Sequence, residues 1–103
     1  MTRQDPKVRK ASILDAALRM ARLHGYRNMT RADIAIAAEC SEGLVSSYFG
    51  TMTQLQRDVV RRAIKLPDLA ILAQALVAKD PHVKKAPSEL LDVAVRSLMQ
   101  DKK

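Results

Sequence analysis

Aromatic side chains are scarce in this chain of 103 residues, which contains one phenylalanine, two tyrosines and no tryptophan. Hydrophobic residues still make up 48% of the sequence, so extensive disorder is excluded and the core must consist mainly of Leu, Ile, Val, Ala and Met. Only three glycines accompany these residues, and the composition therefore predicts an all-α fold. The length predicts one modest hydrophobic core.

The sequence also lacks the residues that most chemistry needs. A single cysteine, Cys40, cannot form an internal disulfide, which fits a reducing cytoplasm. His24 and His82 are not at metal-ligating spacing with each other or with Cys40, and no phosphate-loop, dinucleotide-binding or nucleophile-elbow motif is present. The polar N-terminus lacks a signal sequence, and no apolar run reaches the roughly 18 to 20 residues of a membrane span. We therefore expect a cytoplasmic protein that is not an enzyme, with no metal, no cofactor and no membrane partner.

Positive charge is abundant and unevenly placed. The formal net charge is +7, and residues 1–35 contribute eight Lys/Arg and three Asp/Glu, a net of +5. A basic N-terminal third predicts a localised anionic partner such as nucleic acid. The alternative is that these residues form solvated helix faces that happen to be basic.

Two short helices joined by a tight turn are predicted near the middle of the sequence. Thr30 can cap the first, with Asp33 at nearly capping-box spacing, and Ser41 can cap a second helix over residues 42–49. Gly50 follows where a glycine would end that helix. This arrangement is typical of the helix-turn-helix unit, whose second helix enters the DNA major groove.

A longer helix precedes this unit. Asp5 can cap it, Pro6 suits its first position, and Gly25 ends it. An apolar stripe at helical spacing is formed by Val8, Ile13, Leu14, Ala17, Leu18 and Ala21.

A fourth helix follows, capped by Thr51 with Gln54 completing a capping box, and Pro67 marks its end. Its apolar face consists of Leu55, Val59, Val60, Ala63 and Ile64. We place a domain boundary here, with residues 1–66 as the helix-turn-helix domain and residues 67–103 as a two-helix C-terminal segment.

Two helical patterns lie beyond Pro67, over residues 68–79 and 87–100, separated by residues 80–86. Both apolar stripes are wide for elements that cover so small a body, which predicts burial against a second copy of the chain. The alternative is that both helices fold back over the first four. The residues predicted to mediate dimerisation are Leu69, Leu72, Leu76, Leu91, Val95 and Leu98.

Several residues between Lys10 and Ile64 match the residue types of a known protein family and are separated by the same intervals as in that family. They are Ile13, Ala16, Ala17, Gly25, Thr30, Ile34, Ala35, residues 38–43, Tyr48, Phe49, Thr51 and Leu55. With these residues the stretch resembles the DNA-binding domain of the TetR family of repressors, without any gap. Two positions depart from the family pattern. Ser46 stands where a tyrosine is frequent, and Met52 stands where a phosphate-binding lysine is frequent.

The resemblance implies a TetR-like domain of about four helices in which the helix over residues 42–49 lies in the major groove. Glu42 could accept a hydrogen bond from a cytosine amine, and Gly43 would allow close approach to DNA. Tyr48 would contact a phosphate or base, or pack half-buried. The candidate DNA-binding residues are Arg3, Lys7, Arg9, Lys10, Thr30, Arg31, Ser41, Glu42, Gly43, Ser46, Ser47, Tyr48 and Thr51.

The family resemblance also implies a small transcriptional regulator, a homodimeric repressor that binds double-stranded DNA at an inverted repeat. Only 36 residues follow Pro67, so we expect no ligand-binding domain and no small-molecule effector. Two alternatives remain open. One is a protein-binding module, and the other is a ligand-responsive regulator with a pocket at the dimer interface.

Overall fold

The computed structural model describes residues 5–100 and the side chains of residues 5–97, and every regular element in this part of the chain is helical. The elements are α1 (Pro6–His24), α2 (Arg31–Ala38), α3 (Glu42–Phe49), α4 (Met52–Lys65), α5 (Leu69–Val77), the 3₁₀ helix η1 (Pro81–Lys85) and α6 (Ser88–Gln100). The predicted all-α fold is confirmed.

The helices begin at the caps that the sequence predicts. Thr30 and Thr51 each accept a hydrogen bond from the backbone N–H three residues on, and the side chains of Asp33 and Gln54 accept from the backbone N–H of these caps in return. Both capping boxes are therefore complete. The Ser41 hydroxyl accepts from the Leu44 N–H at 3.1 Å and starts α3. Such caps satisfy backbone donors that a helix leaves without partners.

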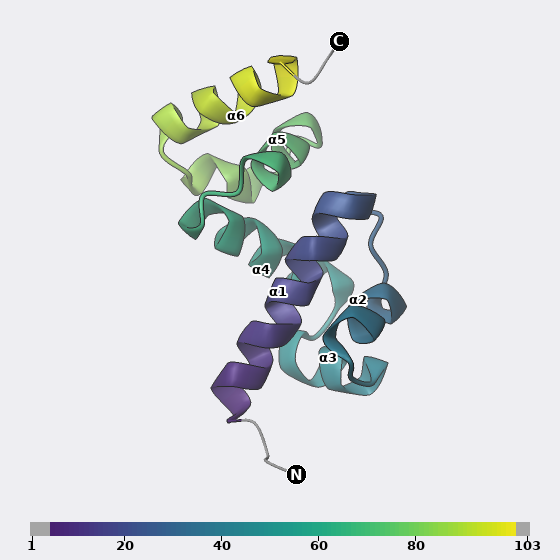
Figure 1. The fold of residues 1–103 in the computed structure, drawn as a ribbon. Helices are drawn as coiled ribbons and strands as arrows, with labels where there is room; N and C mark the ends of the chain where they lie inside the picture. The colour runs from purple at the N-terminus through teal and green to yellow at the C-terminus, as the bar shows by residue number, and fades with distance from the viewer. Residues whose placement is uncertain (1–4, 101–103) are drawn as a thin grey trace.

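The helices form an elongated body of 45 × 25 × 23 Å. Figure 1 shows α1 running along much of its length, with α2 and α3 packed beside one half of α1 and α4 leading away toward the other end. There α5, η1 and α6 form the C-terminal end, and α6 packs on α5. The helix-turn-helix unit and α6 consequently lie at opposite ends of the molecule.

One hydrophobic core joins both ends. Its members include Phe49 and Tyr26 together with many small aliphatic side chains from α1, α2, α4 and α5, and Val83 and Ala94 from beyond the predicted boundary at Pro67. Small residues such as Ala17 and Ala63, both 0% exposed, allow the helices to approach closely. Half-buried Cys40 packs against this core. This single hydrophobic cluster contains residues from both sides of Pro67. The domain boundary at Pro67 therefore stays a prediction.

Three details differ from expectation. Val8 was predicted on the buried stripe of α1 but is 56% exposed, because the first turn of α1 extends beyond the neighbouring helices (Figure 1). Leu72 was predicted at a dimer interface but is completely buried in the chain's own core. Residues 80–86 contain η1, which packs against α4 and fills the break between α5 and α6.

Polar side chains hold the C-terminal part against the end of α1. Gln74 accepts a hydrogen bond from the Tyr26 N–H at 2.9 Å and donates one to the Ala21 carbonyl at 3.0 Å. Asp68 forms an ion pair with Arg22 and also caps α5. These contacts join residues that lie 46 to 53 positions apart in the sequence.

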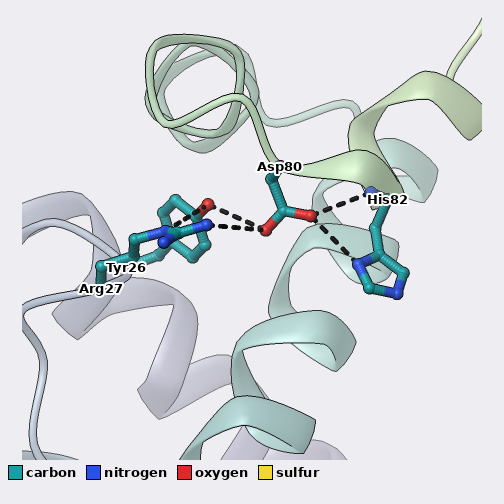
Figure 2. Close-up of polar contacts among 4 residues, drawn as sticks. All are labelled: Tyr26, Arg27, Asp80 and His82. Atoms are coloured by element: carbon teal, nitrogen blue, oxygen red, sulfur yellow. Dashed lines mark hydrogen bonds and ion pairs between the residues drawn. The ribbon is translucent and has the colours of Figure 1, made fainter.

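The most buried of these groups is Asp80, which is 7% exposed. Figure 2 shows its polar contacts. One carboxylate oxygen accepts from the Tyr26 hydroxyl at 2.9 Å, and the other accepts from the His82 backbone N–H at 2.9 Å and lies 3.0 Å from His82 Nδ1. Burial opposes ionisation of Asp80, but the hydrogen bonds from His82 and Tyr26 outweigh it, so the pKa of Asp80 lies below its ordinary value.

This depressed pKa predicts how the protein responds to acid. A carboxylate whose pKa is lower in the folded state stabilises the fold above its unfolded pKa of about 3.9 and loses that effect as the pH falls toward the folded value. Replacing Asp80 with Asn should lower the free energy of unfolding near neutral pH by about 1–3 kcal/mol. It should also flatten the decline in stability between pH 5 and 3. Denaturant unfolding across this pH range measures both effects.

The control is Asp92→Asn, which removes an exposed carboxylate on α6. This variant should keep the wild-type pH profile. If Asp80→Asn and Asp92→Asn give the same profile, the buried carboxylate does not contribute to the acid response.

Candidate DNA-binding surface

Helix α3 is anchored to the core by one of its faces. Val45 is 1% exposed and Phe49 is 5% exposed, and both belong to the hydrophobic cluster. The opposite face presents Gly43 and Ser47, four residues apart and both exposed. The short side chains on this face allow another molecule to approach the helix closely.

The remaining predicted base-contacting residues lie around this face. Glu42 is exposed in the first turn of α3, whereas Ser46 is half-buried. Tyr48 is also half-buried and packs against the core. Ser46 and Tyr48 therefore offer less surface to a partner than Glu42 and Ser47 do.

The turn between α2 and α3 is tight because its backbone closes on itself. Glu39 adopts a left-handed conformation (φ 56°), and the Cys40 N–H donates to the Ala35 carbonyl at 2.9 Å. The exposed hydroxyl of Ser41 accepts from the backbone and keeps its own proton to donate. Thr51, at the start of α4, is exposed and engaged in the same way.

The start of α2 carries a third exposed hydroxyl, that of Thr30. The N–H of Thr30 is occupied by the Asp33 carboxylate, so an anion at this helix would meet the N–H groups of the first helical turn instead. The Thr30 side chain first, and then this N–H, hold the pKa of Asp33 below its ordinary value.

Arg31 connects this helix start to the turn between α3 and α4. Its Nη2 donates to the Gly50 carbonyl at 3.4 Å. Its Nε is buried and has no hydrogen-bond partner among the residues that the structure describes. A buried donor without an acceptor is costly. The half-buried Arg31 side chain nevertheless keeps a positive charge beside the start of α2.

The basic residues of α1 contribute differently. Lys10 is exposed, and its Nζ lies 5.5 Å from the centroid of the Phe49 ring, next to the end of α3. Lys7 is exposed and Arg9 is half-buried in the first turns of α1. Arg3 lies outside the described residues.

Sequence reasoning missed a second group of cations. Lys10 also lines a groove of about 260 Å³ between α1 and α4, to which α4 contributes Arg61, Arg62 and Lys65. Their spacing places the three α4 residues on neighbouring positions of one helix face. That spacing was the available signal, but it could not show that Lys10 lies opposite.

The residues predicted to mediate dimerisation are dispersed. Leu69, Leu76 and Leu91 are half-buried and pack against the chain's own core, and Val95 is 41% exposed. The side chain of Leu98 lies outside the described set. Exposed apolar surface near these residues comes from Val77 on α5 and Val93 on α6.

Two features that would indicate other functions are missing from the described residues. Over residues 5–100, no helix is long and apolar enough to cross a membrane. In the same part of the chain, no three potential metal-ligating side chains lie together.

The fold and the outward face of α3 define a helix-turn-helix domain. Residues 13–59 match the model of the family described as bacterial regulatory proteins, tetR family. Residues 13–59 are therefore similar to the DNA-binding domain of the TetR family, and this match covers somewhat less than half of the chain. Members of this family are regulatory proteins, which agrees with the prediction that the chain is not an enzyme.

One similar protein is the HTH-type transcriptional regulator BetI of Agrobacterium fabrum (strain C58 / ATCC 33970), which is 34% identical over 77 residues. The matched region covers 75% of this chain and 37% of BetI, so the chain spans well under half the length of that relative. No solved structure matches the chain significantly.

Substitution of the glycine within α3 and of the glycine that follows it should have opposite effects on the free energy of unfolding. A Cβ on Gly43 would have only the Ser41 Oγ nearby, at 3.9 Å, so Gly43→Ala should raise the free energy of unfolding by about 0.5–1 kcal/mol. Gly50 has φ +74°, and a Cβ there would lie 2.0 Å from the Gln54 Oε1 that completes the α4 capping box. Gly50→Ala should lower the free energy of unfolding by about 1–3 kcal/mol. Denaturant titration of both variants tests this, and equal effects would contradict it.

Proposed function

We propose that this chain is a sequence-specific DNA-binding transcriptional regulator, acting as a dimeric repressor on an inverted-repeat operator. The observation that carries the proposal is α3 itself, a short helix of a TetR-like domain whose Val45 and Phe49 are buried while Glu42, Gly43 and Ser47 face outward. The description of BetI as an HTH-type transcriptional regulator supports the same function.

In this proposal, the outward face of α3 contacts base edges in the major groove. Glu42 accepts from a cytosine amine, Ser47 donates to or accepts from either kind of base, and Gly43 lets the backbone come close. Ser46 is half-buried, so it contributes only at the edge of this contact surface. Few base contacts are available in one copy, so discrimination between sequences depends on two copies reading two half-sites.

The phosphate contacts come from the residues around α3. The hydroxyls of Thr30, Ser41 and Thr51 have protons to donate, and Arg31 supplies a guanidinium charge at the start of α2. Lys10 adds a charge beside Phe49. Such contacts position the protein on the duplex and make binding depend on salt.

Arg31 provides the sharpest test of this interface. Arg31→Ala should weaken binding to every DNA sequence and reduce the slope of log affinity against log salt by about one. The matched control is Arg96→Ala, because Arg96 is exposed on α6 at the opposite end of the molecule (Figure 1). The affinities of both variants are measured by gel shift on random and genomic fragments at several salt concentrations.

The gel shift also separates the proposal from a protein-binding module. Wild-type protein that shifts no fragment at low salt would rule out DNA binding. A salt slope that Arg31→Ala leaves unchanged would remove Arg31 from the interface while leaving DNA binding in place.

Dimerisation is tested at the exposed apolar surface of the C-terminal helices. Val95→Glu would place a charge within a hydrophobic contact, which should weaken self-association roughly tenfold or more. Val8→Glu makes the same change at an exposed valine of α1 and should leave association unchanged. Sedimentation velocity at micromolar concentrations measures both. A wild-type monomer, or a Val95→Glu dimer of unchanged affinity, would contradict the proposed interface.

A further inference from the structure

A pocket lies where three elements meet, away from the outward face of α3. It has a volume of about 290 Å³. Helix α4 contributes Thr53, Gln56 and Arg57, the connection between α1 and α2 contributes Arg27, and the start of η1 contributes Asp80 and His82. The pocket therefore spans the predicted boundary at Pro67.

Among the residues that line this pocket, Arg57 has a buried side-chain donor that the described fold leaves without a partner. The side chain is half-buried, and its Nε is buried without a hydrogen-bond partner in the described part of the chain. A guanidinium carries five N–H donors in a planar fork suited to a carboxylate or phosphate. The Nε is enclosed by the chain, but the side chain lines the pocket, so the positive charge of this fork would attract an anion there.

The acidic residue of this pocket does not fill that role. Figure 2 shows Asp80 between Tyr26 and Arg27 on one side and His82 on the other. Both of its oxygens already accept hydrogen bonds from Tyr26 or His82, and one lies 4.0 Å from Arg27 Nη2. The hydrogen bonds from Tyr26 and His82 and the nearby Arg27 guanidinium thus compensate most of the negative charge of Asp80.

The balance of charge in the pocket is positive, since Arg27 and Arg57 face a single carboxylate. The Arg27 guanidinium lies 5.6 Å from the Tyr26 ring centroid, and its Nε donates to the Tyr26 hydroxyl at 3.1 Å. Tyr26 therefore holds the Arg27 guanidinium near the pocket. Thr53 and Gln56 add neutral hydrogen-bonding groups at i and i+3 on the same face of α4.

We propose that this pocket binds a small organic anion through a carboxylate or phosphate group, with Arg57 as its principal contact. The volume lies at the lower end for small-molecule sites, which run from about 300 to 1,000 Å³, so the ligand is small. Such an anion would join α4 to η1. The proposal revises the expectation of no small-molecule effector, and it does not depend on DNA binding because α2 and α3 contribute nothing to the pocket.

The test uses the full chain labelled with ¹⁵N and follows amide and arginine Nε resonances by NMR. The probes are inorganic phosphate, acetate and succinate, titrated separately at constant ionic strength. We expect saturable shifts at Thr53, Gln56 and Arg57 with at least one probe. Comparison of phosphate with the two carboxylates identifies which group the pocket prefers.

Arg57→Gln should weaken this binding roughly tenfold or more, because it removes the charged donor. Arg61→Gln is the matched control, since it removes the same charge one turn further along α4 from a residue that does not line the pocket. The control should keep the wild-type affinity.

A second variant keeps the proposal testable if Arg57→Gln unfolds. Thr53→Glu places a carboxylate one turn before Arg57, at a spacing that favours an ion pair, and should abolish binding of the added anion in a folded protein. The proposal is overturned if no probe gives saturable shifts, if Arg57→Gln and Arg61→Gln bind equally, or if Thr53→Glu binds normally. It is also overturned if these resonances respond to duplex DNA alone.

Discussion

The outward presentation of α3 depends on two buried side chains. A helix of eight residues is not stable by itself in water, where isolated helices shorter than about 12–15 residues are marginal. Burial of Val45 and Phe49 supplies the missing stabilisation and, in the same contact, fixes which face of the helix is turned outward. The Ser41 cap and Gly50 then set where the helix begins and ends. The proposed contact of α3 with DNA bases therefore depends on the packing of the core beneath this helix.

A second constraint connects this domain to the helices that follow it. Asp68, Gln74 and Asp80 all come from beyond Pro67, and all reach residues at or just after the C-terminal end of α1. Their partners include the Tyr26 N–H, which follows the helix, and the Ala21 carbonyl, which also accepts from the Gly25 N–H. Because the same few residues cap helices and bridge elements, a change at this junction affects both the local helix and the placement of the C-terminal part. The candidate anion pocket lies beside this junction, which is where a bound ligand would stabilise the arrangement.

Local signals explain why much of the fold could be predicted. Thr30, Ser41 and Thr51 act within three residues of themselves, so their spacing alone was sufficient to place the starts of three helices. Exposure was harder to predict. Val8 fits the apolar period of α1, but only the packing of the other helices decides that it is exposed. Leu72 likewise fits an interface as well as it fits a core, and periodicity cannot distinguish one chain's interior from a contact between two chains.

The arginines show why net charge could not locate the candidate sites. Arg19 donates to the C-terminal turn of α2, Arg22 pairs with an aspartate, and Arg27 donates to a tyrosine hydroxyl. These three arginines therefore make contacts that stabilise the fold itself. Arg31 and Arg57 instead each have a buried Nε for which the described residues provide no acceptor. All five contribute equally to the formal charge of +7. Only their surroundings distinguish Arg31 and Arg57 from the other three, although Arg31 also donates from Nη2 to the Gly50 carbonyl. Arg31 and Arg57 belong to two different surfaces. A DNA phosphate at the first surface and a small anion at the second would be attracted to these guanidinium groups by the same charge.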